Sequence, residues 1–190
     1  LKEVGFNDPA RVMDSYPHQL SGGMCQRIAL VMALATRPRL LIADEPTTAL
    51  DVGVQARILM LLKRKNRELN LPILVITHDF GVVAAIATRV VVMYAGLIQE
   101  EGTADELLAE PLHPYTQALI ASVPDPDDDE FLLSPIPGEP PNLIDQPRGC
   151  RIAPRCKHRF ARCEAAPPPL YEHAGRRVRC HLHDPVGQEK

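Results

Sequence analysis

A glycine-rich turn, followed further along by two adjacent carboxylates, gives this chain its clearest chemistry. The turn, Ser21-Gly22-Gly23, precedes a stretch with few helix breakers and with apolar residues at helical spacing. Serine is a favoured N-cap, and glycine lets backbone N–H groups come close to a ligand. Because the free N–H groups of a helix N-terminus bind anions, the turn predicts a phosphate site. An ordinary serine-capped helix is the alternative.

The two carboxylates, Asp44 and Glu45, follow the short apolar run of residues 40–43. A continuous apolar run is typical of a strand that is buried on both faces of a parallel sheet. Open parallel sheets bind their ligands beyond the carboxyl ends of the strands. At that place we predict that Asp44 serves Mg²⁺, directly or through water, and that Glu45 polarises an attacking water. A simple strand terminus is the alternative.

A second apolar run, residues 73–76, ends in the polar cluster Thr77-His78-Asp79. A lone histidine is more often structural than catalytic. A histidine at the end of a strand that follows an Asp-Glu strand is a better candidate. We predict that His78 reaches a terminal phosphate or the attacking water.

The elements that must position these residues alternate between helical and apolar strand patterns, which predicts a layered α/β domain. Helices are expected over residues 24–36, 52–70 and 80–88. Strands 89–94 and 97–101 are expected to form a hairpin that turns at Ala95-Gly96. Thr103 and Glu106 form a capping box for another helix, which residues 113–116 interrupt and residues 117–123 continue.

These motifs together resemble those of ABC-transporter ATPases. Residues 20–26 resemble the signature motif, residues 40–45 resemble the Walker B strand, and Ala49-Leu50-Asp51 resembles the D-loop, while His78 stands where the family has its switch histidine. The resemblance implies the C-terminal part of a P-loop ATPase domain, an α/β fold in which helices flank a parallel sheet. Cys25 departs from the arginine that many members carry.

The resemblance also implies roles for the site residues. Glu45 would be the general base, and His78 would sense the γ-phosphate of ATP. The γ-phosphate held by a partner subunit would contact Ser21, Gly22 and Gly23, and Gln26 would also be a cofactor-binding residue. Asp44 would serve Mg²⁺, and Asp51 would signal across the dimer. No G-x-x-x-x-G-K-[ST] phosphate loop occurs in the chain. We therefore expect a C-terminal fragment of a longer ATPase, inactive in isolation.

Composition excludes some classes of function. The 190 residues carry 21 Lys and Arg against 24 Asp and Glu, a formal net charge of −3, which gives no case for binding nucleic acid. No apolar stretch approaches the ~18 residues of a membrane span. Residues 124–148 contain seven prolines and the acidic run of residues 127–130, which favours an extended connector.

Four of the five cysteines gather near the C-terminus: Cys150, Cys156, Cys163 and Cys180. Four thiolates can bind zinc or an iron–sulfur cluster, and a metal would help a short segment with little core to fold. The spacings of five, six and sixteen residues include no C-x-x-C knuckle. Free thiols in a loop-rich tail remain an alternative, and four histidines could compete as ligands: His158, His173, His181 and His183.

The tail adds a second resemblance. Residues 113–116 (His-Pro-Tyr-Thr), 136–141 and 149–156 resemble the C-terminal extension of oligopeptide and dipeptide importer ATPases. The resemblance implies a [4Fe–4S] cluster on the four cysteines, with Zn²⁺ as the alternative. It also implies three regions: residues 1–103 from the ATPase domain, residues 104–148 with a helical segment and connector, and residues 149–183 as a metal-binding extension.

The implied protein is a peripheral subunit on the cytoplasmic face of a bacterial membrane. It would pair head to tail with a second ABC ATPase subunit and bind two permease subunits, with an extracytoplasmic solute-binding protein as an indirect partner. The solute is a dipeptide, a longer peptide, nickel or another small molecule. Two alternatives stay open: an ABC ATPase that does not transport, and an iron–sulfur binding or assembly module.

Overall fold

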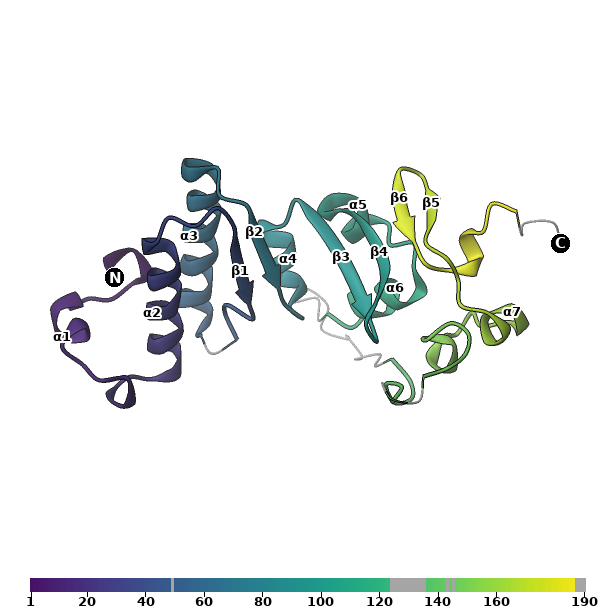
Figure 1. Cartoon of the computed structure of the whole chain (residues 1–190), viewed down its shortest axis with the longest axis horizontal. Coiled ribbons are helices and arrows are strands. Elements are labelled where there is room, and N and C mark those ends of the chain that lie inside the picture. Colours follow the sequence, from purple (N-terminus) through teal and green to yellow (C-terminus); the bar gives the residue numbers. More distant parts are fainter. Residues whose placement is uncertain (49, 124–135, 143, 145, 187–190) are drawn as a thin grey trace, which may run out of the picture. The chain divides into compact units, whose positions relative to one another are not determined.

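The computed structural model describes residues 1–48, 50–123, 136–142, 144 and 146–186. The chain divides into two compact units, Leu1–Ile86 and Ala87–Lys190 (Figure 1). The acidic run of residues 127–130 and the D-loop residue Ala49 lie outside the described residues. The division into regions 1–103, 104–148 and 149–183 stays a prediction.

The first unit is built on two parallel strands, β1 (Leu41–Asp44) and β2 (Ile73–Ile76). Its helices are α1 (Pro9–Met13), α2 (Gly22–Ala35), α3 (Val52–Leu69) and α4 (Phe80–Ile86), with 3-10 turns at Lys2–Val4 and Pro17–Gln19. The three predicted helices are thus confirmed as α2, α3 and α4. Asn70 ends α3 in a left-handed conformation, a conformation that asparagine adopts more readily than most residues.

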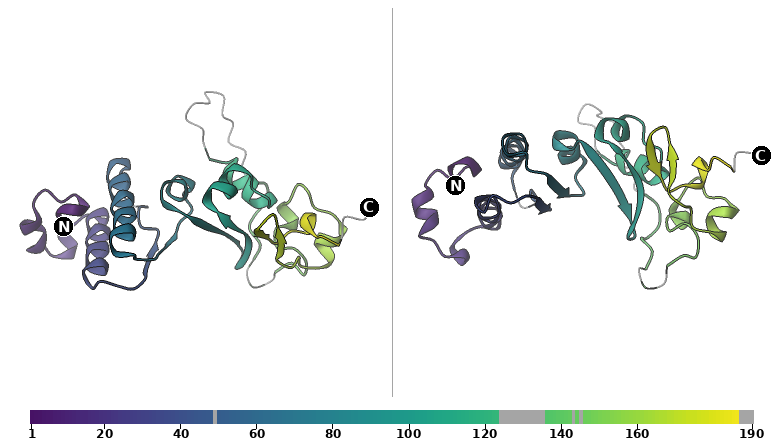
Figure 2. Two further views of the ribbon diagram at one scale, coloured as in Figure 1. Left: turned by 90° about the horizontal axis from the view of Figure 1, so that it is seen from above. Right: turned by 45° about the horizontal axis from the view of Figure 1, so that its top comes forward.

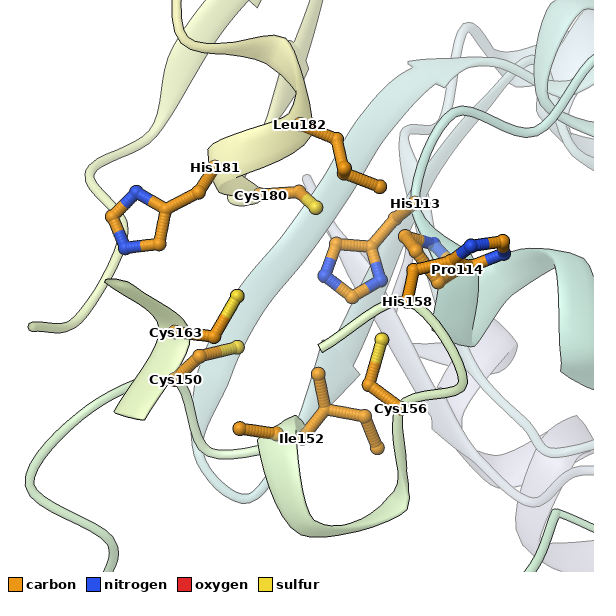
Figure 3. Close-up of a pocket in the computed structure, with 11 residues that line it drawn as sticks. His113, Pro114, Cys150, Ile152, Cys156, His158, Cys163, Cys180, His181 and Leu182 are labelled. Carbon is orange, nitrogen blue, oxygen red and sulfur yellow. The ribbon is translucent and has the colours of Figure 1, made fainter. Parts of the chain in front are cut away.

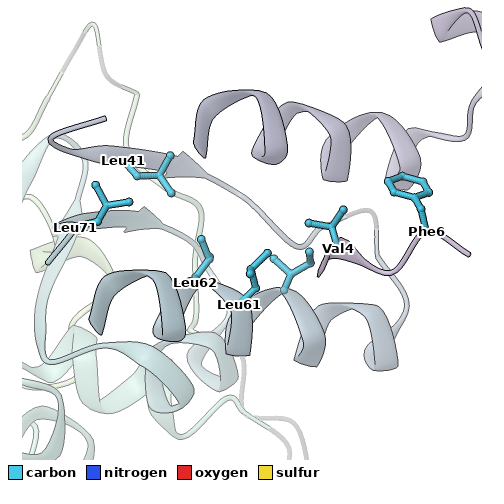
Figure 4. Packing of buried hydrophobic residues seen from close by; sticks show 7 residues of the cluster. Val4, Phe6, Leu41, Leu61, Leu62 and Leu71 are labelled. Atoms are coloured by element: carbon cyan, nitrogen blue, oxygen red, sulfur yellow. The ribbon is translucent and has the colours of Figure 1, made fainter. Parts of the chain in front are cut away.

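The core of the first unit lies between α2, α3 and one face of the two strands (Figure 4). The buried apolar side chains of this cluster are Val4, Phe6, Leu41, Ile58, Leu61, Leu62 and Leu71. The expectation that the first strand is buried on both faces was wrong for the described residues. Leu41 is 5% exposed but Ile42 is 60% exposed, because the helices cover only the face that carries Leu41.

The second unit contains a four-stranded antiparallel sheet in the order β3-β4-β6-β5. Its strands are β3 (Arg89–Tyr94), β4 (Leu97–Thr103), β5 (Tyr171–His173) and β6 (Arg176–Val178). The predicted hairpin is confirmed: Ala95 and Gly96 both have positive φ, the requirement of the tight turn that matches strand twist. The tail contributes β6, which pairs with β4 (Figure 2). No pattern in the sequence predicted this pairing.

Two helices follow the hairpin, α5 (Ala104–Ala109) and α6 (Pro114–Ile120), and α7 (Ala161–Ala165) lies in the tail with 3-10 turns at Ala153–Arg155 and His181–His183. The capping box of Thr103 and Glu106 is confirmed. The predicted interruption of the helix is present, but it lies at residues 110–113, between α5 and α6, and not at residues 113–116. His113 is the N-cap of α6 and Pro114 is its first residue, a position where proline loses no helical hydrogen bond.

A fully buried carboxylate anchors α6 to the sheet. Glu100 of β4 accepts hydrogen bonds from the backbone N–H groups of Leu112 (2.8 Å) and His113 (3.0 Å). Arg176 of β6 lies 3.9 Å from the same carboxylate, and its guanidinium also donates to the backbone oxygens of Glu106 and Glu110. The network ties both helices to the sheet through charge-assisted hydrogen bonds.

Acid should destabilise the second unit through His113. Burial lowers the pKa of this imidazole to about 4, and Nδ1 accepts a hydrogen bond from the Tyr115 N–H. The folded state therefore favours the neutral ring, and its contribution to stability is lost as the pH falls from about 6.5 towards 4, by about 3 kcal/mol. Urea unfolding followed across this range should show a shallower pH dependence for His113→Asn than for wild type.

The matched control for that experiment is His158→Asn, which changes an exposed histidine of the same unit. Its stability should follow the wild-type pH dependence. Parallel curves for wild type and His113→Asn would contradict the assignment.

Candidate functional site

The predicted carboxylate and histidine meet at the carboxyl ends of β1 and β2. The parallel pairing places Asp44 opposite Ile76, and the Glu45 N–H extends the ladder by donating to the Ile76 oxygen at 2.9 Å. The side chains of Glu45, one residue beyond β1, and His78, two residues beyond β2, converge. His78 Nδ1 lies 2.8 Å from Glu45 Oε1, within hydrogen-bonding distance.

The Glu45 carboxylate is held on both of its oxygens. Thr48 donates its hydroxyl to Oε2 at 2.7 Å, while His78 occupies Oε1. The hydrogen bond from His78, followed by that from Thr48, lowers the pKa of Glu45, and the same pairing raises the pKa of His78. The side chain of Glu45 is 38% exposed and that of His78 is 77% exposed, so both are open to a ligand. Glu45 and His78 can together accept a proton from a reacting group above the strand ends and form a hydrogen bond to that group.

The other predicted acids have separate places. Asp44 is exposed at the last position of β1, next to Glu45. Asp51 is the N-cap of α3, where Oδ1 accepts a hydrogen bond from the Val54 N–H at 2.9 Å. Asp44 is free to act as an oxygen ligand for a hard cation, the chemistry that Mg²⁺ prefers.

The glycine-rich turn begins α2 as predicted. Ser21 caps the helix by accepting a hydrogen bond from the Met24 N–H at 3.3 Å. A Cβ on Gly22 would meet no atom within 4 Å, so the packing of this chain does not require glycine there. Gln26, one turn further on, donates its amide to the Glu45 backbone oxygen at 2.7 Å. This contact connects the turn to the strand ends.

Three supporting residues were missed by sequence reasoning. Thr48 holds Glu45, and Gln55 of α3 donates to Asp79 Oδ2 at 3.1 Å. Asp79 also accepts the Gly81 N–H at 2.7 Å, which fixes the turn after His78. A hydroxyl three residues after a carboxylate, and an Asp two residues before a helical N–H, are local signals that could have identified Thr48 and Asp79.

The second unit places the four tail cysteines around one pocket, together with His113, His158 and His181 (Figure 3). Cys150 and Cys163 lie on adjacent backbone segments, since the N–H of the former donates to the oxygen of the latter at 2.7 Å. Apolar side chains, among them Ile152 and Leu182, share the lining.

The prediction of an iron–sulfur cluster, and with it the zinc alternative, is not supported. Among the residues that the structure describes, no group of three or more Cys, His, Asp or Glu side chains is arranged to hold a metal ion. Burial raises the pKa of Cys150 and Cys156, and that of Cys180 to about 11, so these thiols are neutral when no metal is bound. In the structure all four are free cysteines.

Within the described ranges, no helix has the length and apolar character needed to cross a bilayer.

Two family profiles match the chain, "ABC transporter" over residues 1–48 and "Oligopeptide/dipeptide transporter, C-terminal region" over residues 99–163. The oligopeptide transport ATP-binding protein AppD of Bacillus subtilis is 48% identical over 191 residues, which cover 100% of this chain and 58% of AppD. The dipeptide transport ATP-binding protein DppD of Haemophilus influenzae is 49% identical over 181 residues, 95% of this chain and 55% of DppD. The chain thus spans a little over half the length of these relatives.

The fold has a solved relative in the dimeric ATP-binding cassette MJ0796, whose structure is described as a post-hydrolysis state bound to ADP and Pi. That likeness has a TM-score of 0.50 at 35% identity and covers 54% of this chain and 43% of the cassette. The profiles, the relatives and the cassette fold agree with the motifs at the strand ends. The chain belongs to the ABC-transporter ATP-binding proteins, in the group of oligopeptide and dipeptide transporters.

Proposed function

We propose that this chain supplies the water-activating residues and the signature turn of an ATP-hydrolysing subunit in a di- or oligopeptide importer. The observation that carries the proposal is the Glu45–His78 pair, 2.8 Å apart and exposed beyond two parallel strands. A lowered pKa keeps Glu45 ionised, as a group that accepts a proton from water must be. In this role Glu45 orients the attacking water and accepts its proton, while His78 donates to the γ-phosphate or the water.

The residues present fit a magnesium ion at this place. Asp44 offers an exposed carboxylate next to Glu45, and carboxylate oxygen is a preferred ligand of Mg²⁺. When bound, Mg²⁺ neutralises charge that develops on the transferred phosphoryl group. Asp44 would bind the ion directly or through water, which leaves the Glu45 carboxylate for proton transfer.

The signature turn is proposed to serve a second nucleotide site, on a partner subunit. Gly22 faces open space, so a group outside this chain can approach the backbone N–H groups that begin α2. Ser21 and the two glycines would contact the γ-phosphate held by that partner, and Asp51 would signal between the sites. The dimeric state of the MJ0796 cassette supports pairing with a second subunit, which we propose is head to tail.

The remaining partners follow from the names of the relatives, which are transport ATP-binding proteins for oligopeptides and dipeptides. We propose two permease subunits as direct partners and an extracytoplasmic solute-binding protein as an indirect one, with the ATPase peripheral on the cytoplasmic face of the membrane. Because the 190 residues hold no phosphate loop, we propose that they do not turn over ATP alone.

Peptide uptake by living cells tests this function. Cells without the gene should lose ATP-dependent uptake of labelled di- and oligopeptides, and the wild-type gene should restore it. A gene carrying Glu45→Gln should not. Normal uptake in the deletion strain, together with a defect in translation or DNA repair, would instead favour an ABC ATPase that does not transport.

A further inference from the structure

The backbone of Glu45 adopts a conformation that its residue type does not favour. Its φ of 47° lies in the left-handed region, which a non-glycine residue enters at a cost unless neighbouring contacts hold it there. On one side, the Glu45 N–H donates to the Ile76 oxygen at 2.9 Å. On the other side, the Glu45 carbonyl accepts the Gln26 amide at 2.7 Å. The residue is therefore clamped at both of its peptide groups.

The Gln26 contact requires a hydrogen-bond donor. The acceptor is a backbone carbonyl, so the Gln26 atom that faces it must be the nitrogen. Its other atom, Oε1, is buried and has no hydrogen-bond partner among the described residues. An apolar side chain would avoid that cost, and a buried polar group left unsatisfied at a functional site calls for a reason. The reason available here is the bond to Glu45.

Gln26 also links two parts of the candidate site that are far apart in sequence. It lies one helical turn beyond the glycine-rich turn, on a helix whose Met24 and Ile28 pack against the core that contains Leu41 of β1. A shift of the first turn of α2 would therefore move the donor that holds the Glu45 carbonyl. The direction of the Glu45 side chain towards His78 follows from that backbone conformation.

We propose that Gln26 is a positioning residue: it holds the left-handed backbone of Glu45 and so couples the signature turn of α2 to the carboxylate that faces His78. This differs from the nucleotide contact predicted for Gln26 from the sequence, and it rests on the proposed function of Glu45. Phosphate engagement at the α2 N-terminus for one nucleotide would thereby adjust the water-orienting carboxylate of the other site. The link needs no contact between Gln26 and either nucleotide.

Steady-state hydrolysis by the assembled transporter that contains this chain tests the proposal. Gln26→Met removes the donor at similar volume, and Gln26→Glu sets an oxygen against the Glu45 carbonyl. Both should lower kcat by about 10- to 100-fold, the range expected for a small misplacement of a catalytic group, while KM for ATP changes less than about twofold. Gln26→His keeps an N–H donor and should recover part of kcat.

The matched control is Gln117→Met, because Gln117 also donates its amide to a backbone oxygen, that of Pro111 at 2.9 Å, but on the surface of α6. Its kcat should equal that of wild type. Melting temperatures of all variants separate misfolding from misplacement. If Gln26→Met does not fold, the comparison of Gln26→His with Gln26→Glu gives the same contrast between a donor and no donor.

Two results would overturn the proposal. A raised KM with unchanged kcat would make Gln26 a nucleotide contact, and wild-type kinetics in folded Gln26→Met and Gln26→Glu would leave it without a role. Glu45→Gln measured in parallel separates this from the proposed function. If that variant still hydrolyses ATP, the function of Glu45 fails; if it does not while the Gln26 variants turn over normally, only the positioning role fails.

Discussion

Glu45→Gln in the assembled transporter should leave ATP binding intact and slow hydrolysis by at least about 100-fold, the lower range for loss of a general base. The glutamine amide can keep the shape of the side chain and a hydrogen bond to Thr48 or His78. It cannot accept a proton from water. Binding of a fluorescent ATP analogue and release of phosphate, measured on one preparation, give the two quantities.

Glu172→Gln provides the control for that substitution, since Glu172 is an exposed carboxylate on β5, in the other unit. Its hydrolysis should match wild type. Hydrolysis at the wild-type rate by sites that contain only Glu45→Gln would remove Glu45 from the mechanism.

Gly22→Asp should lower ATP turnover without lowering the stability of the fold. The new side chain meets no atom of this chain within 4 Å of its Cβ, and a carboxylate at a helix N-terminus is favourable by about 0.3–1 kcal/mol. The melting temperature should therefore stay the same or rise. The same negative charge repels a phosphate at the α2 N-terminus, so ATP turnover should fall by about 100-fold or more, as when an oxyanion donor is lost.

An aspartate at the start of a different helix controls for charge alone. Ala161 is the exposed first residue of α7, and Ala161→Asp should leave turnover unchanged. Normal turnover by folded Gly22→Asp would show that no phosphate approaches the signature turn.

The local signals in the sequence predicted the elements that local physics controls. Apolar runs predicted β1 and β2, and helical spacing predicted α2 and α3. The Ala95-Gly96 turn followed from the need for positive φ. The dipeptide Ala174-Gly175 joins β5 to β6 in the same way, yet strands of three residues carry too short a pattern to be recognised.

Non-local contacts account for what the sequence could not predict. The pairing of β6 with β4 joins residues more than seventy positions apart, such as Glu100 and Val178. The exposed face of β1 depends on which elements cover the strand, and a run of apolar residues does not report that. The start of α6 did have a signal in the sequence, because proline favours the first position of a helix. The signal was missed because the N-cap before Pro114 is a histidine, which is not among the usual N-cap residues.

The candidate site divides in the same manner. Residue type and spacing predicted Glu45 and His78 at neighbouring strand ends, because parallel pairing brings the ends together. The hydrogen bond from Gln26 could not be predicted in this way. Its acceptor is the backbone oxygen of Glu45, and every residue type has a backbone oxygen. The tail cysteines do share a pocket, but side-chain proximity is not ligation: among the described residues, no group of three or more such side chains is arranged to hold a metal ion.

The most direct test is a structure of the assembled ATPase with Mg²⁺ and a non-hydrolysable ATP analogue. The account predicts one γ-phosphate beside Glu45 and His78 of this chain, with Asp44 serving the ion, and a second γ-phosphate against the Ser21-Gly22-Gly23 turn from the partner's nucleotide. A γ-phosphate distant from both the strand ends and that turn would contradict the proposed site.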